Sequence, residues 1–103
     1  MRKQYTAALL LSDLSQKILA SDSVVLTDDQ KKPLIAIAIS AASKSLTLGL
    51  KDGDIALVYN IGDTNAITVK NLATDTGTSL AYGKVAIVVA STTANATVVT
   101  ALN

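Results

Sequence analysis

The stretch LIAIAISAASKSLTLGL, residues 34–50, decides the fold class of this chain. Over residues 34–39 isoleucine alternates with alanine, so large side chains share one face of an extended backbone and small ones share the other. Over residues 45–50 leucine alternates with Ser, Thr and Gly, which is typical of a strand with one buried and one polar face. The stretch therefore predicts two short strands joined by a loop of small residues.

The same pattern continues along the chain, because short β-branched or aliphatic runs are closed by Gly, Asp, Asn or Thr clusters. The turn formers of residues 51–54 predict a hairpin between the strands on either side. The longest polar stretch, residues 71–79, is expected to be a loop that faces solvent. The further strands are predicted over residues 24–26, 55–60, 67–70, 84–90 and 97–102. This pattern predicts an all-β fold, an antiparallel sandwich or a jelly-roll-like domain.

The first part of the chain has a different pattern. Ser12, Asp13 and Ser15 could cap a short helix that runs to Leu19, and an extended arm is the alternative. The length of 103 residues is common for one domain. We therefore expect an N-terminal arm or short helix over residues 1–22 and a single β-sandwich domain over residues 23–103.

The composition predicts self-association. The chain is 50% hydrophobic and 17% charged, which is more apolar than one small domain needs in order to stay covered by solvated groups. The excess can be buried between the sheets, against copies of the same chain, or in both places. The runs over residues 84–90 and 98–102 are the expected core or intersubunit strands, and a homo-oligomer is the expected state.

The charge pattern argues against two classes of partner. The formal net charge is +1 and the lysines are scattered, without the clustering that follows a phosphate backbone, so no nucleic acid is expected. No run approaches the roughly 20 apolar residues of a membrane-spanning helix, so no membrane is expected either.

The residue types argue against an enzyme. The sequence contains no His, Cys or Glu, so the usual bases, nucleophiles and raised-pKa acids are missing. Pairs such as Asp28 with Asp29 and Asp52 with Asp54 could serve as catalytic carboxylates, but aspartates beside Gly and Lys usually form turns. We therefore predict no catalytic, cofactor-binding or metal-binding residues.

Three binding sites are weaker alternatives. Loop carboxylates could bind calcium, although their spacing matches no dedicated calcium loop, and isolated tyrosines could stack on a sugar. The triplet Asn95-Ala96-Thr97 matches a glycosylation acceptor. The calcium candidates are Asp52, Asp54, Asp63 and Asp75, and the tyrosines are Tyr5, Tyr59 and Tyr82. A carbohydrate-binding or other ligand-binding, adhesin-like sandwich is therefore the alternative function.

A resemblance is carried by residues 58–89, with the runs NIGDTN at 60–65, ITVKN at 67–71, DTGTS at 75–79 and GKVAIVV at 83–89. In this succession of turns and strands the chain resembles small head-fibre and capsid-decoration proteins of tailed bacteriophages. The resemblance implies an all-β, usually trimeric protein on the outside of an icosahedral shell, with the major capsid protein as partner and no catalytic residues. The N-terminal arm, Met1 to Ala20, is then the candidate for attachment to the shell.

Overall fold

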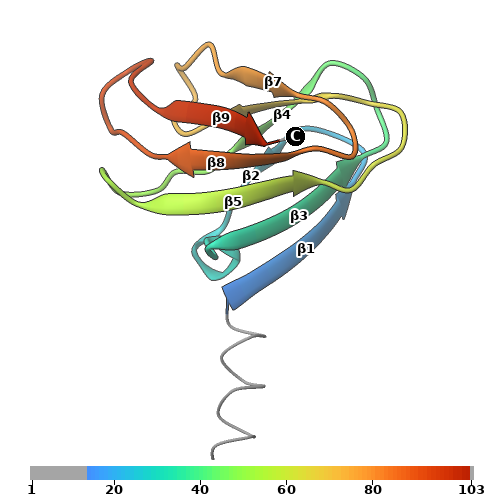
Figure 1. Cartoon of the computed structure of the whole chain (residues 1–103), viewed down its shortest axis with the longest axis horizontal. Coiled ribbons are helices and arrows are strands. Elements are labelled where there is room, and N and C mark those ends of the chain that lie inside the picture. Colours follow the sequence, from blue (N-terminus) through green and yellow to red (C-terminus); the bar gives the residue numbers. More distant parts are fainter. Residues whose placement is uncertain (1–13, 103) are drawn as a thin grey trace, which may run out of the picture.

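The computed structural model describes residues 14–102, which form an all-β fold of two sheets with one short 3₁₀ turn, η1 (Asp28–Gln30). The all-β class is thereby confirmed. The five-stranded sheet has the order β1-β3-β5-β8-β9 and the four-stranded sheet has the order β2-β4-β6-β7 (Figure 1). The strands are β1 (Ser15–Ala20), β2 (Val24–Val25), β3 (Leu34–Ile39), β4 (Lys44–Thr47), β5 (Ile55–Asn60), β6 (Ile67–Lys70), β7 (Thr78–Leu80), β8 (Val85–Val89) and β9 (Val98–Leu102).

From β1 to β6 the chain winds as a coil, because successive strands alternate between the two sheets. Each turn of the coil places its strands parallel to those of the turn before. Leu34 pairs with Leu57 and Lys44 pairs with Ile67, so both strands of the second turn pair with residues 23 positions later. A structural repeat is therefore present without a convincing repeat in the amino-acid sequence.

The last three strands close the coil with antiparallel pairs, β6 with β7, β5 with β8, and β8 with β9. Strand pairing is therefore mixed, whereas the sequence pattern favoured an antiparallel sandwich throughout. The predicted hairpin around residues 51–54 is also wrong, because β4 and β5 belong to different sheets. The turn itself forms, since the N–H of Asp54 donates to the carbonyl of Lys51 at 3.0 Å. Turn-forming residues indicate where the chain reverses its direction. They do not indicate which strand the following strand pairs with.

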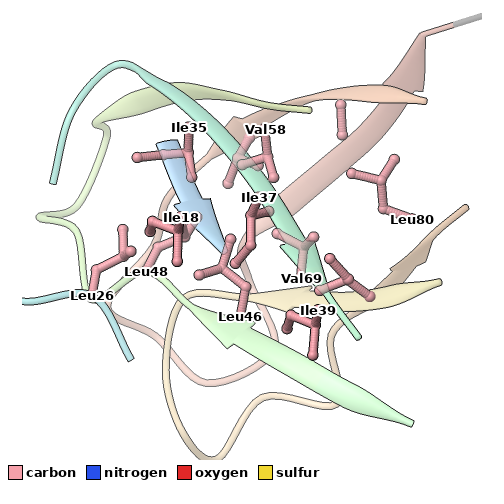
Figure 2. Packing of buried hydrophobic residues seen from close by; sticks show 13 residues of the cluster. Ile18, Leu26, Ile35, Ile37, Ile39, Leu46, Leu48, Val58, Val69 and Leu80 are labelled. Carbon is pink, nitrogen blue, oxygen red and sulfur yellow. The ribbon is translucent and has the colours of Figure 1, made fainter. Parts of the chain in front are cut away.

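The core lies between the sheets and is made of the inward-facing half of each strand (Figure 2). The three isoleucines of β3 are buried, while the alanines between them lie on the outer side and are half-buried. Leucines and valines from the other sheet meet them, among them Leu46, Leu48 and Val69. Burial of this layer is the main contribution to stability, because apolar area removed from water contributes roughly 25 cal/mol per Å².

Two expectations for the chain ends and loops require correction. Residues 15–20 form β1, which pairs with β3 along its whole length, and are neither a helix nor a free arm. The globular unit therefore includes residues assigned above to the N-terminal segment. The remainder of that segment, residues 1–13, lies outside the described residues. Within the predicted loop over residues 71–79, Thr78 begins β7, and both Asn71 and Asp75 are buried instead of facing solvent.

Candidate functional site: an apolar outer sheet face

The carboxylates that the sequence offered for catalysis or calcium lie in turns and loops, and none of the described ones gather in a group of three. The side chain of Asp52 accepts a hydrogen bond from the N–H of Thr92 at 3.3 Å, and Asp63 accepts one from the hydroxyl of Thr64 at 3.4 Å. Asp28 lies at the start of η1 and its carboxylate is 3.1 Å from the Lys31 ammonium at an exposed position. Within residues 14–102, no three acidic side chains come close enough to hold a metal ion.

Asp75 fastens two loops together. Its Oδ1 accepts a hydrogen bond from the N–H of Asn95 at 2.7 Å, and its Oδ2 accepts bonds from the N–H groups of Leu72 at 3.0 Å and Asn71 at 3.3 Å. These donors, with that of Asn95 first, hold the pKa of Asp75 below its ordinary value of 3.8. Because both carboxylate oxygens already accept hydrogen bonds from the backbone, the role of this side chain is to hold the two loops together.

Two buried asparagines that the sequence did not single out join the sheets. The Nδ2 of Asn60 donates to the carbonyls of Asn65 and Leu80, and its Oδ1 accepts from the N–H of Gly62. Asn60 ends β5 in one sheet and Leu80 ends β7 in the other, so one amide connects both. Asparagine is so common next to turns that its type gave no signal for this role.

Asn71 makes a similar set of bonds at the end of β6. Its Nδ2 donates to the carbonyls of Leu50 at 3.1 Å and Ser91 at 3.0 Å, and its Oδ1 accepts from the N–H of Leu50 at 2.7 Å. Every buried side-chain polar atom of the described residues has a partner. The buried side chains of residues 14–102 therefore present no unpaired polar atom that needs a ligand.

The two tyrosines that the structure describes belong to different elements. Tyr59 lies on the outer side of β5 with its ring partly exposed, and Tyr82 is exposed in the turn between β7 and β8. Tyr5 lies outside the described residues. Asn95 is exposed at a positive φ of 60°, which asparagine tolerates, and its Oδ1 accepts from the N–H of Thr76 at 2.7 Å. The amide oxygen of Asn95 is thus used in the contact between two loops.

One surface stands out because it is apolar. The strand registers place four rows of side chains on the outer side of the five-stranded sheet, and apolar residues dominate each row. We call this surface the apolar face. Its members are Ser15, Lys17, Leu19, Leu34, Ala36, Ala38, Ile55, Leu57, Tyr59, Val85, Ile87, Val89, Val98, Thr100 and Leu102.

The exposed hydrophobic residues of the molecule gather on this face. Among residues 14–102, ten large hydrophobic side chains are exposed, and seven of them belong to the apolar face. The largest exposed fractions there are 69% for Leu19, 62% for Ile55 and 56% for Val98. A depression of about 230 Å³ lies over β1, β3, β5 and β8, and Leu34, Leu57 and Val85 contribute to its lining. Scattered exposed hydrophobic residues are ordinary, but a contiguous patch marks an interaction surface.

The outer side of the four-stranded sheet has the opposite character. We call it the polar face. Its register rows contain Ser45, Thr47, Thr68, Lys70 and Ser79, with Val25 as the apolar member. Thr fits a strand well, so apart from Val25 these strands form without apolar outward side chains.

A polar groove of about 240 Å³ lies beside the polar face, between β6 and the loop that precedes β9. Lys70, Thr78, Asn95 and Thr97 are among its lining residues. The hydroxyl of Thr97 and the amide oxygen of Asn95 already bond to backbone groups, at Ser91 and Thr76. The groove is therefore less suited to a ligand than its volume alone suggests.

Comparisons of the chain with protein-family models, with curated proteins and with solved structures gave no match. A search of the described residues also detected no helix with the length and hydropathy that crossing a membrane requires.

Proposed function

We propose that this chain is a non-catalytic structural protein that decorates the outer surface of a tailed-phage capsid as a homotrimer. The observation that carries the proposal is the apolar face. A monomer gains nothing from exposing Leu, Ile and Val across a whole sheet, whereas a protein built to assemble buries such a face in contacts. The interior adds to this support, because every buried side-chain polar atom of the described residues already has a hydrogen-bond partner within the chain.

The virion part of the proposal is supported by the resemblance over residues 58–89 to head-fibre and capsid-decoration proteins. Those residues include β6, β7, β8 and half of β5, together with the turns between them. The major capsid protein would be the partner and the capsid surface the location. An assembly role also fits the composition, because a chain without His, Cys or Glu lacks the common catalytic groups.

The attachment role proposed for the N-terminal arm has to be narrowed to residues 1–13, because residues 15–20 belong to the five-stranded sheet. Deleting residues 1–20 would remove an outer strand and damage the fold. Deleting residues 1–13 leaves every strand of the described fold in place. We expect the shorter deletion to abolish binding to the capsid while the trimer survives.

The test is co-sedimentation of the purified chain with capsids of the virus that encodes it, combined with the mass in solution from light scattering. The proposal predicts a trimer that sediments with capsids and saturates at a fixed number of copies per shell. A chain that stays monomeric at about 100 µM, or a trimer that remains in the supernatant, would contradict it.

The alternative function is a ligand-binding module, and the polar groove is a candidate site for such a ligand. That function predicts a higher melting temperature on addition of calcium or of a glycan, because a ligand that binds only the folded state stabilises that state. An unchanged melting temperature with a panel of simple sugars and with calcium would leave the assembly role as the better account.

A further inference from the structure

We infer that the apolar face is the surface through which three copies of this chain contact one another, with the three five-stranded sheets turned toward a common axis. The four-stranded sheets and their polar faces then point outward. This inference rests on the proposed function and deepens it, because it assigns the contact to one sheet and names its occupant as further copies of the same chain.

The area of the face fits an interface between copies. The seven exposed side chains leave an apolar area on the order of 600 Å² open to solvent, at the upper end of what the largest patch of a soluble monomer reaches. Stable interfaces between two chains bury about 800 Å² on each partner, and in a threefold contact each copy divides its face between two neighbours. The half-buried side chains between them, such as Leu57 and Ile87, bring the face close to that value.

The charge distribution favours a copy of the same chain over a charged partner. Among the described residues, the apolar face includes no carboxylate and one ammonium group, that of Lys17. Lys17 lies on β1, which is an edge strand of the sheet, so its long side chain can hold the charge at the rim in water. The middle of the face, on β5 and β8, is uncharged. Two or three such faces can meet without burying an unpaired charge.

The width of the sheet suits a threefold arrangement. Five strands spaced about 4.8 Å apart make a face about 20 Å wide. If three such faces form the sides of a triangular prism, each sheet lies about 6 Å from the axis. Sheets that pack face to face are about 10 Å apart, so the side-chain layer of each sheet is about 5 Å thick. One layer of side chains from each copy therefore fills the centre.

The test compares the same substitution type on the two faces. Tyr59→Lys places a charge in the middle of the apolar face, on β5, and Val98→Lys places one on β9. Ser79→Lys, on the polar face, is the matched control. Light scattering over a range of concentrations gives the mass of each variant, and circular dichroism establishes that each is folded. We expect Tyr59→Lys and Val98→Lys each to raise the dissociation constant of the trimer about a hundredfold or more, and Ser79→Lys to leave it unchanged.

The outcomes separate this inference from the proposed function. Folded Tyr59→Lys and Val98→Lys variants that remain trimeric would overturn the assignment of the contact, while wild-type binding to capsids would still support the virion role. A wild-type dimer would overturn the threefold arrangement. A wild-type monomer that fails to sediment with capsids would overturn both.

Discussion

The two outer faces of this molecule come from strands of the same coil and yet differ in chemistry. β3 and β4 are consecutive in the chain, but the outward side chains of β3 are Leu and Ala, whereas those of β4 are Ser and Thr. A strand can form with either apolar or polar outward side chains, because both kinds of residue occur in strands and only the inward half of each strand forms the core. The difference therefore reflects what lies outside each face, water over the polar face and, as we propose, another copy over the apolar face.

The largest expected effect separates inward from outward isoleucines. Ile37 is fully buried and Ile55 is 62% exposed on the apolar face. Ile37→Ala should lower the free energy of unfolding by about 4 kcal/mol because it leaves a cavity in the core. Ile55→Ala should cost less than about 1 kcal/mol when the protein is dilute, and more at concentrations at which copies associate. Urea unfolding at two protein concentrations measures the free energy of unfolding of both variants. Equal losses of free energy for Ile37→Ala and Ile55→Ala would contradict the distinction between inward and outward isoleucines.

The next effect concerns the amide that joins the sheets bearing the two faces. Asn60→Ala removes three hydrogen bonds and leaves the buried carbonyl of Leu80 without its side-chain donor. We expect a loss of about 3 kcal/mol in the free energy of unfolding. Asn65→Ala, which removes one bond to the carbonyl of Ile39, should cost about 1 kcal/mol. If the two variants unfold at the same urea concentration, Asn60 does not have the role assigned to it.

A smaller, pH-dependent effect is expected at Asp75, which joins the loop between β6 and β7 of one sheet to the loop between β8 and β9 of the other. The pKa of Asp75 is lowered in the folded state by N–H donors, so its contribution to stability is present above the ordinary value of 3.8 and is lost as the pH falls through the folded pKa. Asp75→Asn should melt below the wild type at pH 7, and the difference should shrink as the pH is lowered past 3.8.

The control for this effect is Asp29→Asn, which removes one charge from an exposed turn. Melting curves from pH 7 to pH 2 compare the three proteins. A difference between wild type and Asp75→Asn that stays constant with pH would show that the bonds to Asn95 and Leu72 add nothing through ionisation.

The smallest effect on stability comes from making the polar face resemble the apolar one. Thr68 and Ser79 are cross-strand neighbours, and the double substitution Thr68→Val with Ser79→Val keeps the strands and adds apolar surface. The free energy of unfolding should change by less than about 1 kcal/mol. The mass from light scattering should rise above that of the wild type, because each chain then has two apolar faces. An unchanged mass would show that outward apolar residues do not drive association in this fold.

The sequence predicted much of this structure where the signal was local. The alternation over residues 34–39 predicted β3 with large and small side chains on opposite faces, and the strands over residues 55–60 and 67–70 have the predicted bounds. The runs that were apolar on both sides, at 55–60 and 84–90, contribute to the middle of the apolar face. The sequence alone therefore indicated which runs contain more hydrophobic residues than one buried side of a strand requires.

What the sequence could not give was long-range. Periodicity identifies a strand but not its neighbour, so the coil of parallel pairs and the absence of a hairpin at residues 51–54 were missed. β1 carries Ser, Gln and Lys beside its aliphatic residues, and pairing with β3 overrides the helix signal there. Asn60 and Asn71 look like turn residues, and their burial depends on carbonyls far away in the chain.

The most direct test of the central claim is the reactivity of a single thiol placed on each face. The chain has no cysteine, so Ile55→Cys and Ser79→Cys each carry one reactive group. The rate of alkylation is measured for each variant in the native and urea-unfolded states. The account predicts that the thiol at position 55 is strongly protected in the concentrated native protein and becomes reactive on dilution, while the thiol at position 79 reacts freely throughout. Equal and unprotected reactivity at both positions in the concentrated native protein would contradict the claim that the apolar face is a contact between copies.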